Sequence, residues 1–241
     1  MLHMIRVKDY EELSKKAAMM LGAQVLVKPD SVLCLPTGTT PIGMYAQLVA
    51  AYRRRELDFS RVRIFTLDEY LGLPGTHKQS YRYFMQQHLY SEINIPEENT
   101  FNPDGTTQDL AKTCEEFDEQ IRRLGGIDLV FLGLGHNCHI GFNEPADQFT
   151  VETHPVDLSE STVKANSRFF DNPDEVPRWA ITMGLGSIMA ARRVVVIVSG
   201  EDKADALHRS FFGPVTPQTP ASILQLHPDV TVICDEAAAG V

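Results

Sequence analysis

The regular alternation of two kinds of segment constrains the fold of this chain more than any other feature of its sequence. Short apolar runs rich in β-branched residues carry few internal charges, as strands covered on both faces do. Longer stretches with helical character separate them, and such alternation predicts an α/β fold with a parallel sheet, right-handed crossovers and helices on both faces. The predicted strands are residues 32–35, 62–67, 127–132, 194–198 and 230–234, and the predicted helices are residues 11–27, 41–55, 80–89, 109–124 and 203–212.

The length and uniformity of the chain indicate one domain. A chain of 241 residues can form one α/β domain or two small ones. Because no repeat, low-complexity tract or linker divides the sequence, we expect residues 1–241 to fold as a single domain. Residues 145–180 are polar and irregular, and we expect them to form a small flap or an antiparallel addition on one side of the sheet.

The composition limits the partners and the compartment of this protein. The 22 Lys and Arg residues face 32 Asp and Glu residues, and no basic run exceeds residues 53–55, which argues against a nucleic-acid partner. The four cysteines are widely spaced and form no C-x-x-C pair, as in a reduced cytoplasmic protein. No signal peptide or apolar run of membrane-spanning length is present, so we expect no membrane partner.

A glycine-rich polar loop follows the predicted strand at 127–132. Residues 133–144 include His136, Asn137, His139 and Glu144. Open α/β sheets bind their ligands at the carboxyl ends of the strands, which is where this loop would lie. The pattern therefore favours a binding or catalytic role over a loop whose polar side chains only cap one another.

A second loop predicts a phosphate site. Residues 36–41 join a strand to a helix and place the hydroxyls and backbone of Thr37, Gly38, Thr39 and Thr40 near a positive helix end. Pro41 suits the first helical position and Thr40 the N-cap. The loop is not a Walker motif, because no lysine follows the glycine. Taken alone, it is equally compatible with a plain capped turn.

Two cations complete the predicted phosphate site. Lys203 is expected one turn into the helix that follows the strand at 194–198, where it can reach toward an anion. Arg168 stands in an apolar-flanked segment, which is unusual for an arginine. A lone lysine or arginine is usually solvated at the surface, so the assignment depends on both lying near the threonine-rich loop.

Two adjacent carboxylates, Asp68 and Glu69, follow the strand at 62–67. Like charges in a cleft of low dielectric are costly if they serve only structure. Asp68 comes first after the strand and is the better candidate for an acid/base, and its position is equally compatible with a cap of the following turn. A metal site built on His136, Cys138, His139 and Glu144 is less favoured, because no second ligand pair appears elsewhere in the chain.

Four motifs in sequence order resemble the glucosamine-6-phosphate deaminases. They are residues 67–73 (LDEYLGL), 133–146 (GLGHNCHIGFNEPA), 165–170 (ANSRFF) and 224–227 (LQLH), and the likeness extends from about residue 30 to 236. The resemblance implies a modified Rossmann-like fold without a metal or organic cofactor. It also implies conversion of glucosamine 6-phosphate and water to fructose 6-phosphate and ammonia.

The resemblance also implies roles for individual residues. Asp68 is similar to the base that moves a proton between C2 and C1, His139 to the ring-opening catalyst, and Glu144 to its orienting partner. Residues 36–41, Arg168 and Lys203 match the phosphate site. Asn137 stands where many members carry aspartate; it lacks the negative charge but can orient an imidazole by hydrogen bonding. Cys138 stands where the pattern usually has glycine, which adds bulk and a site of potential oxidation.

Further departures bear on assembly and on rival functions. Residues 147–158 lack the basic residues that bind an activator in allosteric members, and the chain ends soon after its last strand. We therefore expect a non-allosteric monomer or low-order homo-oligomer. The rival functions are a 6-phosphogluconolactonase-like hydrolase, which would not need Asp68 for proton transfer between carbons, and a non-catalytic sugar-phosphate sensor. A sensor has no use for Asp68, His139 and Glu144 together, and no DNA-binding segment is expected before residue 30.

Overall fold

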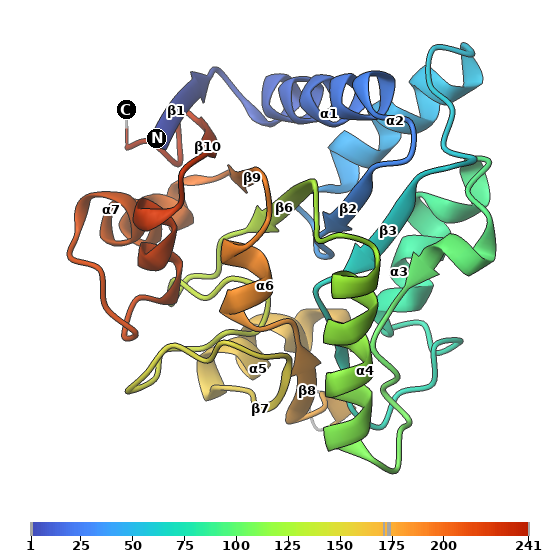
Figure 1. Cartoon of the computed structure of the whole chain (residues 1–241). Coiled ribbons are helices and arrows are strands. Elements are labelled where there is room, and N and C mark those ends of the chain that lie inside the picture. The colour runs from blue at the N-terminus through green and yellow to red at the C-terminus, as the bar shows by residue number, and fades with distance from the viewer. Residues whose placement is uncertain (1, 171, 173–174, 241) are drawn as a thin grey trace.

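The core of the protein is a seven-stranded sheet in which every strand pair is parallel. The computed structural model describes residues 2–170, 172 and 175–240. The strand order is β1-β10-β9-β6-β2-β3-β5, so strands adjacent in space are often distant in sequence (Figure 1). The strands are β1 (Leu2–Val7), β2 (Val32–Leu35), β3 (Arg63–Thr66), β5 (Thr100–Phe101), β6 (Leu129–Gly133), β9 (Val194–Val198) and β10 (Val230–Asp235).

Helices cover both faces of this sheet, as the alternation of segments predicts. The α-helices are α1 (Tyr10–Val27), α2 (Ile42–Arg53), α3 (Tyr81–His88), α4 (Leu110–Arg123), α5 (Glu160–Asn166), α6 (Leu185–Met189) and α7 (Ala204–Phe212). Successive residues of β2 point to opposite faces. Leu33 packs with α1, α2 and α3 on one face, whereas Cys34 packs with α4, α6 and α7 on the other. The single-layer sheet between two helical layers confirms the predicted α/β architecture.

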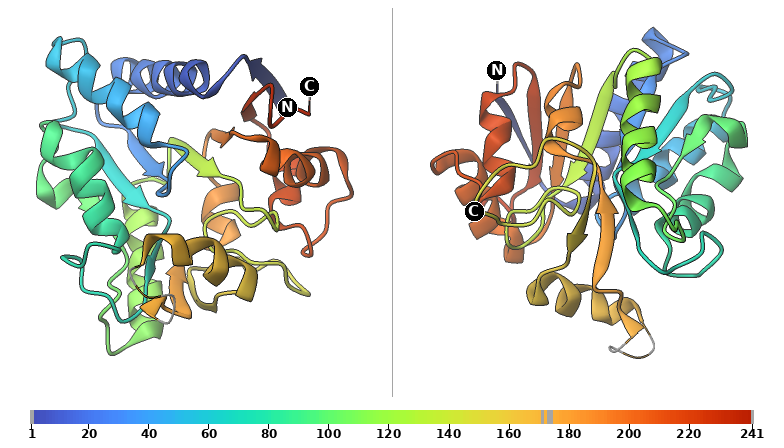
Figure 2. Two further views of the ribbon diagram at one scale, coloured as in Figure 1. Left: turned by 180° about the vertical axis from the view of Figure 1, so that it is seen from behind. Right: turned by 60° about the horizontal axis from the view of Figure 1, so that its bottom comes forward.

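A second, smaller sheet of three antiparallel strands includes part of the segment at 145–180. Its order is β4 (Asp68–Tyr70), β8 (Trp179–Thr182) and β7 (His154–Asp157). Helix α5 and the 3₁₀ helix η3 (Ser167–Phe169) connect β7 to β8. Figure 2 shows this sheet and α5 together at one end of the main sheet. The expected antiparallel addition is therefore confirmed, and it brings α5 close to the residues that follow β6.

Four neighbouring strands of the main sheet end at the same edge. In the order β9-β6-β2-β3, they are followed by the loops that begin at residues 199, 134, 36 and 67. Because parallel strands share one carboxyl edge, all four predicted polar loops meet there.

Among the described residues, no helix is long and apolar enough to cross a membrane.

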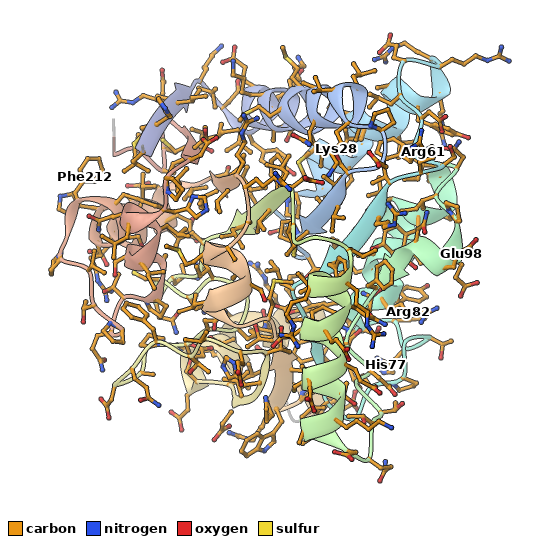
Figure 3. The ribbon with its side chains drawn as sticks, in the orientation of Figure 1. Lys28, Arg61, His77, Arg82, Glu98 and Phe212 are labelled. Carbon is orange, nitrogen blue, oxygen red and sulfur yellow. The ribbon has the colours of Figure 1, made fainter. Side chains whose placement is uncertain are left out.

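Polar side chains at the opposite edge of the sheet are structural. Lys28, labelled beside α1 in Figure 3, follows the end of that helix, and its ammonium group donates to both Asp128 carboxylate oxygens, at 2.8 and 2.7 Å. The same carboxylate accepts from the backbone N–H of Val32 at 2.8 Å. Asp128 thus joins α1 to the starts of β2 and β6, and it lies far along the sheet from the polar loops.

Two local predictions were wrong. Helix α2 begins at Ile42, and its N-cap is Pro41 with φ −78° and ψ −8° and no side-chain cap, so Thr40 does not cap the helix. The proline already has helical dihedral angles, and the Thr39 carbonyl accepts from the Ile42 N–H at 3.3 Å. Lys203 ends the 3₁₀ helix η5 (Glu201–Lys203) and precedes α7 instead of lying one turn inside it.

Candidate active site

The four polar loops and α5 enclose one cavity of about 400 Å³ at the carboxyl edge of the sheet. Every predicted site residue except Glu144 lines it, and Glu144 lies directly behind His139 and Asn137. The lining residues from the prediction are Thr37, Gly38, Thr39, Thr40, Asp68, Asn137, His139, Arg168 and Lys203. The threonine-rich loop and the two cations therefore share a cavity with the candidate acid/base residues.

His139 and Glu144 form a partly buried pair. The His139 Nδ1 atom lies 3.7 Å from a Glu144 carboxylate oxygen, and the two side chains are 20% and 9% exposed. The ring of His139 packs directly over Gly135, where a Cβ atom would lie 2.4 Å from Nε2. Glycine at 135 is therefore required for this position of the imidazole, which leaves the ring facing the cavity.

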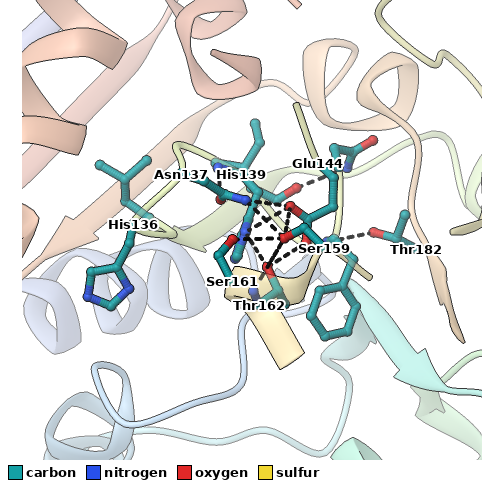
Figure 4. A network of polar contacts seen from close by, with 12 residues as sticks. His136, Asn137, His139, Glu144, Ser159, Ser161, Thr162 and Thr182 are labelled. Carbon is teal, nitrogen blue, oxygen red and sulfur yellow. Dashed lines mark hydrogen bonds and ion pairs between the residues drawn. The ribbon is translucent and has the colours of Figure 1, made fainter. Parts of the chain in front are cut away.

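Hydrogen bonds hold the Glu144 carboxylate on several sides (Figure 4). Thr162 donates to Oε1 at 2.5 Å, and Asn137 and Ser159 donate to Oε2 at 2.5 and 3.2 Å. Burial favours the neutral acid, but these bonds and the interaction with His139 outweigh it and lower the pKa of Glu144 to about 2. Glu144 is consequently a fixed negative charge behind the imidazole at all ordinary pH values.

Asn137 does not orient the imidazole in the way that the sequence suggested. Its Nδ2 atom donates to Glu144, and its Oδ1 atom accepts from the backbone N–H of His139 at 3.3 Å. The amide therefore contacts the Glu144 carboxylate and the main chain of His139. Among the described residues, the ring nitrogen Nδ1 of His139 contacts Glu144 and Thr162. Because an amide can donate to Glu144 and a carboxylate cannot, asparagine suits this arrangement.

The two adjacent carboxylates of β4 have different surroundings. Glu69 faces the start of α3, where its carboxylate accepts from the Ser80 hydroxyl at 2.8 Å and from the N–H groups of Tyr81 and Arg82 at 3.0 Å each. Asp68 instead lines the cavity, and among the described residues no side chain or N–H donates to its carboxylate. Glu69 is thus a helix cap, and Asp68 does not cap the following turn.

Burial makes Asp68 a weaker acid than an ordinary aspartate. The residue is 6% exposed, and burial, together with the charge of Glu69, raises its pKa well above the usual range of aspartate. A carboxylate with a raised pKa is a better proton acceptor than an ordinary one. The structure therefore separates one unpartnered, cavity-facing carboxylate from a second that is fully engaged in structure.

The part of the cavity predicted to bind phosphate (the phosphate end) is formed by the loop at residues 36–41, Arg168 and Lys203. The Tyr45 hydroxyl donates to the Pro36 carbonyl at 2.5 Å, and the Tyr10 hydroxyl donates to the Thr39 carbonyl at 3.2 Å, so both ends of the threonine-rich loop are fixed. Arg168 lies over the Phe169 ring, 4.8 Å from its centroid. Burial lowers the pKa of the Lys203 ammonium group, and the nearby charge of Arg168 adds to that effect although Asp202 opposes it.

The residues weighed as metal ligands do not converge. His136 contacts Asp202, whereas His139 faces Glu144, and the two rings point apart in Figure 4. Within the described part of the chain, no group of three or more His, Cys, Asp or Glu side chains is arranged to hold a metal ion. Cys138 is fully buried with φ 71°, a conformation that favours glycine, and its thiol contacts the Ala206 carbonyl at 3.7 Å.

Sequence reasoning missed the contribution of α5 to the site. Ser159 caps this helix by accepting from the Thr162 N–H, and both hydroxyls also donate to Glu144. The cap itself has a sequence signal, because serine before a short polar helix is a common N-terminus. The contact of Ser159 with Glu144, fifteen residues earlier, has no sequence signal, because it depends on the path of β7.

Comparisons with known proteins agree with this geometry. A model of the family described as glucosamine-6-phosphate isomerases/6-phosphogluconolactonase matches residues 9–233. The chain belongs to this family. Relatives named glucosamine-6-phosphate deaminase include one from Lachnoclostridium phytofermentans, 54% identical over 233 residues that cover 97% of this chain and 99% of the relative. Another, from Clostridioides difficile, is 50% identical over 232 residues that cover 96% and 93%. The resemblance drawn from the four motifs is confirmed.

Solved structures show the same fold. A structure described as a monomeric glucosamine-6-phosphate deaminase superimposes with a TM-score of 0.97 at 39% identity, covering 99% of both chains. A 6-phosphogluconolactonase from Trypanosoma cruzi superimposes with a TM-score of 0.79 at 21% identity, covering 100% of this chain and 96% of the other. The second likeness concerns the fold alone, and the first confirms the predicted Rossmann-like architecture over the whole domain.

Proposed function

We propose that this protein converts glucosamine 6-phosphate and water to fructose 6-phosphate and ammonia. The observation that carries the proposal is the joining of two kinds of chemistry in one cavity. The threonine-rich loop, Arg168 and Lys203 can hold a phosphate, and Asp68 and the His139–Glu144 pair can act on the sugar carbons. The substrate is a small phosphorylated amino sugar, and neither a metal nor an organic cofactor takes part.

The first chemical step is opening of the sugar ring. The C1 hydroxyl loses a proton, the C1–O5 bond breaks, and O5 gains a proton, which leaves an open-chain aldehyde with a free amine at C2. We assign the transfer at O5 to His139, because an imidazole can exchange a proton near neutral pH. The ionised Glu144 carboxylate stabilises the imidazolium form of the ring, which is the form that donates.

The second step moves a proton between two carbons. Asp68 removes the proton from C2, the aldehyde oxygen at C1 becomes protonated, and an enolamine forms. Asp68 then returns its proton to C1, which gives a protonated ketose imine at C2. Its burial supports this role, since a base of raised pKa is closer to the strength that carbon acids require. Water adds to the imine carbon, and the C2–N bond breaks to release ammonia and fructose 6-phosphate.

A 6-phosphogluconolactonase-like hydrolase is the second candidate, and the likeness of fold is the observation that favours it. Lactone hydrolysis needs a base that activates water but no proton transfer between neighbouring carbons. The buried and unpartnered carboxylate of Asp68 supports the deaminase instead. The His139–Glu144 pair and Asp68 likewise argue against a sensor that only binds a sugar phosphate. We further propose that the protein is a monomer or a low-order homo-oligomer that acts in the cytoplasm.

A direct assay tests the proposal. The purified protein should release ammonia and fructose 6-phosphate from glucosamine 6-phosphate in equal amounts, and EDTA should have no effect on the rate. 6-Phosphogluconolactone serves as the comparison substrate and should be hydrolysed no faster than in buffer. Lactone hydrolysis without ammonia release would establish the second candidate, and activity that returns only with added zinc would contradict the metal-free reaction.

A further inference from the structure

A chain of three polar side chains at the phosphate end of the cavity is not explained by the roles assigned so far. The His136 Nε2 atom lies 2.6 Å from an Asp202 carboxylate oxygen, and its Nδ1 atom lies 3.2 Å from the Lys203 ammonium nitrogen. The Lys203 ammonium group also donates to the Leu134 carbonyl at 2.9 Å. His136 and Leu134 follow β6, whereas Asp202 and Lys203 follow β9, so the contacts tie two adjacent loops together.

The chemistry of these groups determines the direction of each hydrogen bond. An ammonium group only donates, so the Nδ1 atom of His136 must accept from Lys203. The remaining proton of the neutral ring is then on Nε2, where it faces the acceptor oxygen of Asp202. Lys203 has three N–H donors, of which the Leu134 carbonyl and His136 engage two. One donor is left for a ligand in the cavity that these side chains line.

We propose that His136, oriented by Asp202, is a positioning residue that holds the Lys203 ammonium group toward the phosphate of the bound sugar. This inference rests on the proposed function, because it presumes a phosphorylated ligand. Lysine is a compact charge on a flexible four-carbon chain, so a single fixed position costs side-chain entropy. An acceptor that holds the ammonium group before the ligand arrives reduces that cost on binding.

The surrounding charges explain why Lys203 needs this support. Arg168 is near enough to disfavour the charged form of Lys203, so the two cations repel each other in the empty cavity. The carboxylate of Asp202 has the opposite effect on Lys203, and its pKa is lowered by its hydrogen bond with His136. A neutral imidazole between Asp202 and Lys203 offers an acceptor without adding a positive charge. The acceptors on one side of the ammonium group thus counter the repulsion from Arg168.

Two amide variants separate positioning from mere presence of a polar side chain. His136→Asn keeps an acceptor oxygen where Nδ1 stands, next to Lys203, whereas His136→Gln keeps a polar group only near Nε2, next to Asp202. We expect His136→Ala and His136→Gln to weaken the binding of fructose 6-phosphate about three- to tenfold, as the loss of one hydrogen bond does. His136→Asn should stay within about twofold of the wild type. His3→Ala, on the edge strand β1, is the matched control and should change nothing.

The experiment measures two quantities for each variant. Titration calorimetry gives the dissociation constant of fructose 6-phosphate, and ammonia release gives KM and kcat. The proposal requires a change in KM with kcat nearly unchanged, and no additional effect of His136→Ala in a Lys203→Ala background. Wild-type affinity in His136→Ala would overturn it, as would an equal loss in the Lys203→Ala background, which would mean that His136 contacts the ligand directly.

Binding and turnover by the wild-type protein test the two proposals separately. If the wild type binds fructose 6-phosphate but releases no ammonia, the proposed function is wrong and the series of dissociation constants still decides the role of His136. A wild-type protein that binds no sugar phosphate would overturn both.

Discussion

Replacing Asp68 by asparagine should stop the carbon chemistry and leave phosphate binding in place. The amide has nearly the same shape but cannot accept the C2 proton. A positioned acid/base contributes on the order of 10²–10⁴ in rate, or about 3–5 kcal/mol of barrier. The substitution leaves the cations assigned to the phosphate unchanged, so the dissociation constant of fructose 6-phosphate should change less than about threefold. The assay is incorporation of solvent deuterium at C1 of fructose 6-phosphate, measured by NMR.

The same substitution should make the folded protein more stable at neutral pH. Burial, together with Glu69, raises the pKa of Asp68, so the folded state resists ionisation of this carboxyl more than the unfolded state does. Stability is therefore lost as the pH rises from the ordinary aspartate range toward the raised folded pKa. Asparagine avoids that loss, and we expect a gain of roughly 0.5–2 kcal/mol at pH 7. At pH 7, the Tm should rise by about 2–4 °C for each kcal/mol gained. The gain should disappear near pH 3, where the carboxyl is protonated in both the folded and the unfolded state.

Glu69→Gln is the matched control, because it changes the neighbouring carboxylate in the same way. Glu69 accepts hydrogen bonds from Ser80 and from two N–H groups of α3, so its loss should lower stability by roughly 1–2 kcal/mol. Its activity per folded molecule should remain within a few-fold of the wild type. Undiminished deuterium incorporation in Asp68→Asn would refute the reasoning, and so would a pattern in which Glu69→Gln lost the exchange and Asp68→Asn kept it.

The remaining predictions concern the phosphate end, the support of Glu144 and regulation. Arg168→Ala and Lys203→Ala should each raise KM about tenfold or more with a smaller effect on kcat, and wild-type use of glucosamine without its phosphate at equal efficiency would contradict the assignment. Thr162→Val removes one donor to Glu144 and should lower kcat about three- to tenfold in assays of initial rate, whereas an unchanged kcat would show that this hydroxyl serves only structure. Substrate curves should be hyperbolic and insensitive to N-acetylglucosamine 6-phosphate, because residues 147–158 offer an anion no lysine or arginine; sigmoidal curves that this ligand makes hyperbolic would contradict that expectation.

The features that the sequence predicted are those with a local signal. A β-branched run followed by polar residues indicates both a buried strand and the place where its loop emerges, so the meeting of Asp68, His139 and Lys203 at one edge followed from the parallel order of the strands. The features that the sequence did not reveal depend on partners distant in sequence. Strand β1 pairs in parallel with β10 near the other end of the chain, and nothing in its six residues, half of them exposed, shows that partner. Thr162 reaches Glu144 only because β7 and β8 fold back beside β4.

The contrast between the two carboxylates in the site explains how one cavity can hold both a base and a fixed charge. Glu144 receives hydrogen bonds from Thr162, Asn137 and Ser159 and faces His139, so it stays ionised despite its burial. Asp68 is also buried but receives no such bonds from the described residues, so its burial, together with the charge of Glu69, raises its pKa. Two acids whose surroundings give them different pKa values can have different catalytic roles. Glu144 can stabilise a charged imidazole without taking its proton, and Asp68 can take a proton from carbon and give it back.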